Sequence, residues 1–131
     1  MYMLDTNMCI YIIKKRPISL MEKFNSIPKN NICISVVTYA ELQYGVERSS
    51  SKKMNQDIVD DFISHLTVLS WDMDAAHRYG KIRSTLEEKG TPIGNMDLLI
   101  AAHALSQKCT LVSNNLREFN RIKDLKSENW V

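Results

Sequence analysis

Three carboxylates and one amide stand where the sequence could bring them together for metal chemistry. Asp5 directly follows an apolar run, Glu41 comes five residues after Val36, and Asp97 begins a strongly apolar stretch. Asn115 follows another apolar run near the end of the chain. Converging buried carboxylates repel one another, so they must be paired, protonated or bound to a metal. Oxygen ligands without a His and Cys cluster favour Mg²⁺ or Mn²⁺ over zinc.

Each of these residues could also have a purely structural role. Asp5 could cap the helix that follows it, and the spacing Thr38-x-x-Glu41 fits a capping box. Asp97 would lie in the first turn of its helix, where the helix dipole favours a negative charge by ~0.3–1 kcal/mol. Asn115 could cap the short helix after it. For each residue taken singly, the sequence leaves capping and metal binding open.

Four short apolar runs predict the strands that would position these side chains. They do not alternate between apolar and polar residues, which is typical of strands buried on both faces in a parallel sheet. Ligands gather at the carboxyl ends of such strands, where Asp5 and Asn115 are expected. The runs are YML (2–4), ICISVV (32–37), TVLSW (67–71) and CTLVS (109–113).

Helical segments separate the predicted strands, and this alternation indicates an α/β fold with three layers. Asp72 precedes one helix and is interpreted as its cap, and Gly90 closes the same helix. His103 lies on a helix that is apolar on almost every side and is interpreted as a core residue. The predicted helices span 7–15, 19–26, 38–49, 54–65, 73–90, 96–108 and 116–122.

The bulk properties suit one compact domain over residues 1–131. The chain is 44% apolar and 24% charged with a net charge of +2, which argues against disorder and is compatible with a polyanionic partner. No apolar stretch approaches the ~20 residues of a spanning helix, and residues 1–13 lack the features of a signal peptide. We therefore expect a cytoplasmic protein without membrane contact. Its three cysteines are expected to be buried free thiols: Cys9, Cys33 and Cys109.

Four blocks, in order along nearly the whole chain, resemble those of the PIN-domain ribonucleases, and within them the VapC toxins of bacterial toxin–antitoxin pairs. The blocks are YMLDTN, ISVVTYAELQYG, GTPIGNMDLLIAAHAL and LVSNNLREF. The resemblance implies a single PIN-like α/β/α domain with a short, mainly parallel sheet of four to five strands. It also implies metal-dependent hydrolysis of RNA phosphodiester bonds.

By this resemblance, Asp5, Glu41 and Asp97 fall on the three acidic catalytic positions. Asn115 falls where many PIN domains carry a fourth Asp and many VapC toxins carry Asn. This departure leaves less negative charge for a second metal, so one tightly bound Mg²⁺, or alternatively Mn²⁺, is expected. All four residues are predicted to bind or orient the metal, with Glu41 holding water or acting as general base. The supporting positions are Thr6, Asn7, Ser113 and Glu118.

A narrower resemblance concerns the RNA that is cut. CIYIIKKRP, TPIG, NNLREF and the closing Trp130 are similar to VapC toxins that cleave initiator tRNA in the anticodon stem-loop and so inhibit translation. Other tRNAs, ribosomal RNA or mRNA are alternatives. A non-catalytic RNA-binding module and a metal-dependent phosphatase are less favoured. A phosphatase of the haloacid type needs a second Asp where this chain has Asn7.

The resemblance also implies partners. VapC toxins usually form homodimers and a hetero-oligomer with a VapB antitoxin, which covers the acidic site and alone contacts operator DNA. The apolar helix surfaces IYII and DIVDDFISHL could serve such contacts or pack the core. RNA phosphates are expected to contact basic residues: Lys14, Lys15, Arg16, Lys52, Lys53, Lys81 and Arg83.

Overall fold

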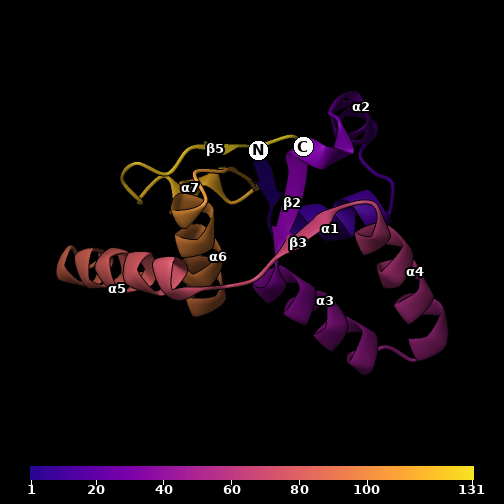
Figure 1. Cartoon of the computed structure of the whole chain (residues 1–131), viewed down its shortest axis with the longest axis horizontal. Helices are drawn as coiled ribbons and strands as arrows, with labels where there is room; N and C mark the ends of the chain where they lie inside the picture. Colours follow the sequence, from indigo (N-terminus) through magenta and orange to yellow (C-terminus); the bar gives the residue numbers. More distant parts are fainter.

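Five short parallel strands form the centre of the computed structural model, which describes residues 1–131 (Figure 1). The order across the sheet is β3-β2-β1-β4-β5, so the first strand lies in the middle. Every neighbouring pair is parallel. The strands are β1 (Tyr2–Leu4), β2 (Ile32–Ser35), β3 (Thr67–Leu69), β4 (Thr110–Val112) and β5 (Ser127–Glu128).

The strand register brings the ends of the three central strands to one level. Leu4 of β1 is paired with Ile34 of β2 on one side and with Val112 of β4 on the other. All three side chains are buried. The residues that directly follow these strands therefore lie at the same edge of the sheet, which is formed by the carboxyl ends of the strands and is called the carboxyl edge.

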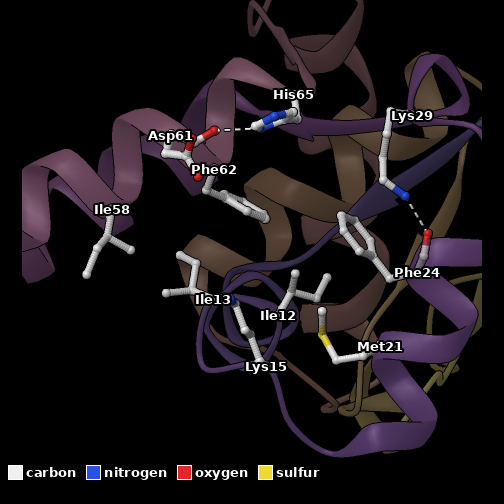
Figure 2. A pocket seen from close by; sticks show the side chains of 10 residues that line it. All are labelled: Ile12, Ile13, Lys15, Met21, Phe24, Lys29, Ile58, Asp61, Phe62 and His65. Atoms are coloured by element: carbon white, nitrogen blue, oxygen red, sulfur yellow. Dashed lines mark hydrogen bonds between the residues drawn. The ribbon is translucent and has the colours of Figure 1, made fainter.

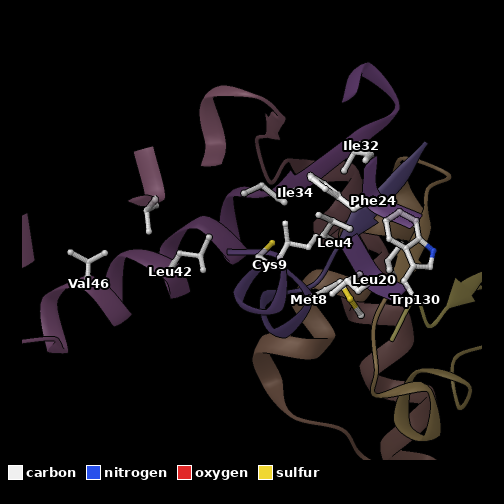
Figure 3. Close-up of a cluster of buried hydrophobic side chains, with 13 residues drawn as sticks. Leu4, Met8, Cys9, Leu20, Phe24, Ile32, Ile34, Leu42, Val46 and Trp130 are labelled. Carbon is white, nitrogen blue, oxygen red and sulfur yellow. The ribbon is translucent and has the colours of Figure 1, made fainter. Parts of the chain in front are cut away.

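Helices cover both faces of the sheet. On one face, Met8 of the first helix and Leu42 of the third share a core with Leu4 and Ile34 (Figure 3). Val59 of the fourth helix belongs to the same core. On the other face, α5, α6 and α7 pack over a second core that contains Met3 and Leu111. The helices are α1 (Thr6–Ile13), α2 (Ile18–Ser26), α3 (Val36–Arg48), α4 (Lys52–Ser64), α5 (Met73–Glu88), α6 (Asn95–Ser106) and α7 (Leu116–Phe119), with a 3₁₀ turn at Lys29–Asn31.

The three-layer α/β prediction is confirmed, with two local corrections. The second strand ends at Ser35, and Val36 and Val37 belong to α3, although β-branched residues favour strands. The Ser35 hydroxyl accepts a hydrogen bond from the Val37 amide at 3.1 Å and so caps α3. Thr38 therefore lies inside the helix and is not its cap, and the predicted capping box with Glu41 is wrong.

The structure also tests the predictions made for the cysteines, Asp72 and His103. All three cysteines are buried and free. Asp72 caps α5 by accepting from the Ala75 amide at 3.1 Å. His103 is fully buried, but only half satisfied: its Nδ1 shares a 2.7 Å hydrogen bond with the Ser35 hydroxyl, while its Nε2 has no partner. No helix combines the length and apolar character that crossing a membrane requires.

Candidate active site

Asp5 occupies the carboxyl end of the central strand. Its backbone amide still bonds to the Val112 carbonyl of β4 at 3.0 Å, while its side chain accepts from the Met8 amide at 2.9 Å and caps α1. Only 4% of the residue is exposed. Burial raises the pKa of the Asp5 carboxyl, and hydrogen bonds from Ser113 and the Met8 amide partly oppose that rise. Asp5 thus caps a helix, and its charge remains poorly compensated.

Glu41 is held toward Asp5 by a partner on another helix. The Thr6 hydroxyl, at the start of α1, donates a 2.5 Å hydrogen bond to Oε1 of Glu41 on α3. The negative charge of Glu41 contributes to the raised pKa of Asp5, which places the two carboxylates in electrostatic contact. The contact joins residues that lie 35 positions apart, and it leaves Oε2 of Glu41 without a partner within the chain.

Asp97 approaches from the opposite helix layer. It lies in the first turn of α6, whose N-cap Gly94 offers no side chain to the helix end. A methyl group on Gly94 would lie 3.9 Å from Asp97 Oδ2, so the loop backbone passes close to this carboxylate. The helix start therefore presents Asp97 toward the carboxyl edge of the sheet.

The segment after β4 closes the site. The Ser113 hydroxyl accepts from the Asn115 amide at 2.8 Å, and the Asn115 side-chain nitrogen donates to Oε2 of Glu118 at 3.2 Å. Asn115 also lies near Asp97, where its amide lowers the pKa of that carboxyl. Asn115 does not cap α7 with its side chain. In this arrangement its amide nitrogen orients the neighbouring acids.

The electrostatics of Asp97 show that four carboxyl groups face one space. Its pKa rises to about 6, first through burial and then through the charges of Asp5, Glu118 and Glu41. No basic side chain pairs with any of these acids, because the ion pairs of the chain lie elsewhere. The site therefore carries uncompensated negative charge.

This repulsion predicts that Asp97→Asn stabilises the metal-free protein. The raised pKa means that folding with an ionised Asp97 costs on the order of 1 kcal/mol after solvent screening is allowed for. That cost is full above pH 6, where the folded carboxyl is ionised, and disappears near pH 4, where it is protonated in the folded state. We expect the melting temperature to rise by roughly 3–5 °C at pH 7.5, about half as much at pH 5, and not at pH 4.

Asp74→Asn is the matched control for this melting experiment. Asp74 is exposed in the first turn of α5, where the helix dipole favours its charge and no acid cluster opposes it. Its replacement should leave the melting temperature unchanged or slightly lower. If Asp97→Asn behaved in the same way, Asp97 would be a helix-end charge and not part of a repelling set.

The donor set fits a hard divalent cation. It consists of carboxylate, hydroxyl and amide groups, which suit Mg²⁺ or Mn²⁺ and not zinc. No three His, Cys, Asp or Glu side chains lie close enough together to enclose an ion. Mg²⁺ does not require such a cage, since it keeps several waters and is commonly bound through one or two carboxylates. Asp5 and Asp97, which repel each other across the site, are the natural pair.

The basic residues predicted to contact RNA fall into two groups, those that form an ion pair within the chain and those that do not. Three are engaged in ion pairs: Lys52 with Glu47 at 3.6 Å, Lys53 with Asp57 at 2.8 Å, and Arg83 with Glu87 at 3.1 Å. Lys14, Lys15, Arg16 and Lys81 form no ion pair. Among the supporting residues, Asn7 is exposed, whereas Thr6, Ser113 and Glu118 join the contacts described above.

An apolar groove of about 530 Å³ opens between α1, α2 and α4 (Figure 2). Figure 2 shows Ile12, Ile13, Phe24 and Phe62 around its centre, with Ile58 at one end of the groove. Met21, His65, Asp61, Lys15 and Lys29 complete the lining. A second hollow shares Ile13 and Ile58 with the groove and extends from there to Glu41, so it links the groove to the acidic site. The sequence indicates the apolar faces of α1 and α4 but not that α2 joins them.

The chain is similar to several known proteins over nearly its whole length. The PIN domain family matches residues 2–125. Ribonuclease VapC2 of Rickettsia felis is 48% identical over 130 residues, which cover 98% of this chain and 97% of that protein. The tRNA(fMet)-specific endonuclease VapC of Salmonella typhimurium is 46% identical over 129 residues, 98% of this chain and 97% of the relative. The crystal structure of VapBC2 from Rickettsia felis bound to a promoter DNA fragment superposes with a TM-score of 0.93 at 46% identity, covering 99% of this chain and 98% of the other.

Proposed function

The chain belongs to the PIN-domain family and, within it, to the VapC ribonucleases, and we propose that it is a divalent-metal-dependent endoribonuclease that cleaves initiator tRNA. The observation that carries the proposal is the convergence of Asp5, Glu41, Asp97 and Glu118 without a basic partner. Such a pocket would repel RNA by itself. Metal is therefore required for substrate binding as well as for hydrolysis.

Asp5 and Asp97 would hold the cation, and Mg²⁺ or Mn²⁺ are the ions their chemistry favours. When bound, the cation lowers the pKa of its water and neutralises charge on the scissile phosphate. Asn115 keeps Glu118 in place by donating a hydrogen bond to it, and it lowers the pKa of the neighbouring Asp97. Ser113 fixes the backbone of Asn115 and so the direction of this amide.

Glu41 is the general base of the proposed reaction. Thr6 occupies Oε1 of Glu41, so Oε2 remains available to accept a proton from the attacking water. The water oxygen bonds to phosphorus as the bond from phosphorus to the leaving ribose oxygen breaks, and that oxygen takes a proton from solvent water. No side chain needs to form a covalent intermediate. Thr6 is a positioning residue that fixes the rotamer of Glu41.

The anticodon stem-loop of initiator tRNA is the proposed target because two kinds of support coincide. Relatives in Salmonella typhimurium and Shigella flexneri, at 46% and 43% identity, are named tRNA(fMet)-specific endonucleases. The loop offers unstacked single-stranded nucleotides, which proteins recognise more readily than the narrow groove of an RNA duplex.

Sequencing of cellular RNA ends after brief expression of the protein tests this target. We expect new ends in the anticodon stem-loop of initiator tRNA before other RNAs change. Intact initiator tRNA together with new ends in another RNA would overturn the tRNA assignment and retain the ribonuclease. The absence of any new end would overturn both.

We propose that the apolar groove receives a cognate VapB antitoxin. Side chains from α1, α2 and α4 line the groove. The second hollow, which adjoins the groove at Ile13 and Ile58, leads to Glu41. An amphipathic segment seated there could continue over the acidic site and exclude RNA. Two cations at the rim, Lys15 and Lys29, would favour an acidic flank on that segment.

Ile58→Glu should weaken antitoxin binding by about 10–100-fold, because a carboxylate would be buried against apolar groups. Ile58 is 40% exposed, so the free protein should fold and cleave RNA as before. Met54→Glu is the matched control, since Met54 lies on the same helix, is 58% exposed and does not line the groove. Isothermal titration with the antitoxin measures the difference. Equal affinities for the two variants would place the antitoxin elsewhere.

A further inference from the structure

A second charged feature lies away from the acidic site. One cleft of about 200 Å³ runs between α5, the end of α6 and the segment after α7. A second cleft of about 300 Å³ shares Arg78, Leu105 and Asp124 with it and extends it past the start of β4. The two together form what we call the basic cleft. Its cations are Arg78, Lys81, Lys89, Lys108, Arg121, Lys123 and Lys126.

The basic cleft is unusual in its charge balance. It gathers seven of the 17 lysines and arginines of a chain whose net charge is only +2, and Asp124 is the one acid in its lining. None of the seven cations forms an ion pair within the chain. Their charges are therefore available to a ligand, and the whole cleft would attract a polyanion.

The helical spacing of α5 makes one wall of the cleft continuous. Arg78, Lys81, Thr85 and Lys89 follow at intervals of three or four residues and so lie along one face of the helix. Arg78 to Lys89 extends roughly 16 Å along the helix axis. A row of this length can contact several successive phosphates of one strand. Apolar Ile82 and Leu105 form the floor, against which ribose rings can pack.

The opposite wall connects the cleft to the acidic site. Arg121 donates a 3.0 Å hydrogen bond to the Pro92 carbonyl, in the loop that leads into α6 and Asp97. Glu118, whose charge acts on Asp97, lies three residues before Arg121. Figure 1 shows α5 at the opposite end of the molecule from α4, so the basic cleft is separate from the apolar groove.

We infer that the basic cleft binds the sugar–phosphate backbone of the RNA substrate at a distance from the bond that is cut. The inference rests on the proposed ribonuclease function and adds a second point of attachment to it. The acidic site repels phosphate, so a structured RNA gains most of its ionic attraction here. Short RNAs that span only the acidic site do not reach the cleft.

The test compares two triple variants that remove the same charge. Arg78→Gln/Lys89→Gln/Lys123→Gln removes three exposed cations from the cleft. Lys23→Gln/Lys29→Gln/Arg48→Gln removes three cations from α2, the 3₁₀ turn and α3, none of which is predicted to contact RNA. Binding of full-length initiator tRNA is measured with Mg²⁺ in an Asp5→Asn background, so that the RNA stays intact. Cleavage is measured in the active protein on the same tRNA and on a single-stranded RNA of six nucleotides.

We expect the cleft variant to bind tRNA at least tenfold more weakly at ~0.15 M salt, and its log Kd to depend on log salt with a slope smaller by about 2–3. Its cleavage of tRNA should fall in proportion, while its cleavage of the short RNA stays unchanged. The control variant should change the slope by less than one.

Equal losses in the two variants, or no loss in either, would overturn the basic cleft as an RNA site while the ribonuclease proposal stands. Binding of a duplex DNA of mixed sequence is measured in parallel, and a loss confined to that DNA, with tRNA binding intact, would overturn the RNA site and assign the cleft to DNA. Failure of the unaltered protein to cleave any RNA would overturn the proposed function itself.

Discussion

Asp5→Asn should reduce RNA cleavage by about 10³-fold or more and abolish growth toxicity. The substitution removes one of the two carboxylates proposed to hold the cation, whose stabilisation of transition-state charge amounts to several kcal/mol, at one factor of ten for each 1.4 kcal/mol. It should not unfold the protein. Asn caps helices about as well as Asp, so the hydrogen bond from the Met8 amide can persist. Replacing a buried carboxylate whose pKa is raised also relieves a cost of folding.

Asp72→Asn provides a closely matched control. Asp72 also precedes a helix and also accepts from an amide three residues on, but it is exposed and outside the acidic site. Melting curves of both variants and gel analysis of tRNA cleavage separate capping from catalysis. We expect Asp72→Asn to cleave as the unaltered protein does. RNA ends shared by the Asp5→Asn and unaltered proteins would remove Asp5 from the chemistry.

The sequence predicts most of the fold because its strands are buried on both faces. Continuous apolar runs such as 2–4 and 109–113 are too short for buried helices, and with helical segments between them they fit the strands of a parallel sheet. The fifth strand, Ser127–Glu128, carries no such signal because it is short, polar and at the sheet edge. The second strand ends earlier than its residue types predict because the Ser35 hydroxyl outweighs the β propensity of two valines.

The sequence predicts which residues gather at the acidic site better than it predicts the hydrogen bonds between them. Asp5 and Asn115 follow strands of a parallel sheet, so sequence order alone places them at one edge. The hydrogen bond from Thr6 to Glu41 depends on how α1 packs against α3, which no local pattern encodes. A capping box is the contact that local spacing predicts for Glu41, and the tertiary contact replaces it.

The apolar groove and the basic cleft are harder still to predict from the sequence, because each depends on contacts between distant segments. The apolar groove needs side chains from three helices, and the sequence indicates only the faces of α1 and α4. The basic row on α5 is readable from its spacing, yet Arg121 and Lys123 come from a segment without periodicity. Convergence of distant segments, and not the type of any residue, creates both surfaces.

Metal binding to the RNA-free protein should weaken about tenfold between pH 7.5 and pH 5. A carboxylate must be ionised to bind a cation, and the pKa of Asp97 is about 6. The carboxyl is almost fully ionised at pH 7.5 and about one-tenth ionised at pH 5, so protons compete with Mg²⁺ in that ratio. The rise in melting temperature during a MgCl₂ titration gives the half-saturating concentration at each pH, without the contribution of metal bound to tRNA.

Chelation of divalent metal in the same series should reduce the rate of tRNA cleavage by about 10³-fold or more, and added Mg²⁺ or Mn²⁺ should restore it. Asp97→Asn serves as the control, because it removes both the ligand and the titrating group. Its melting temperature should be higher without metal and insensitive to MgCl₂ at either pH. Half-saturation at the same concentration at pH 7.5 and pH 5 would contradict Asp97 as a ligand. The uncompensated charge that destabilises the metal-free site is the same property that prepares it for a cation, so stability without metal and affinity for metal should change in opposite directions.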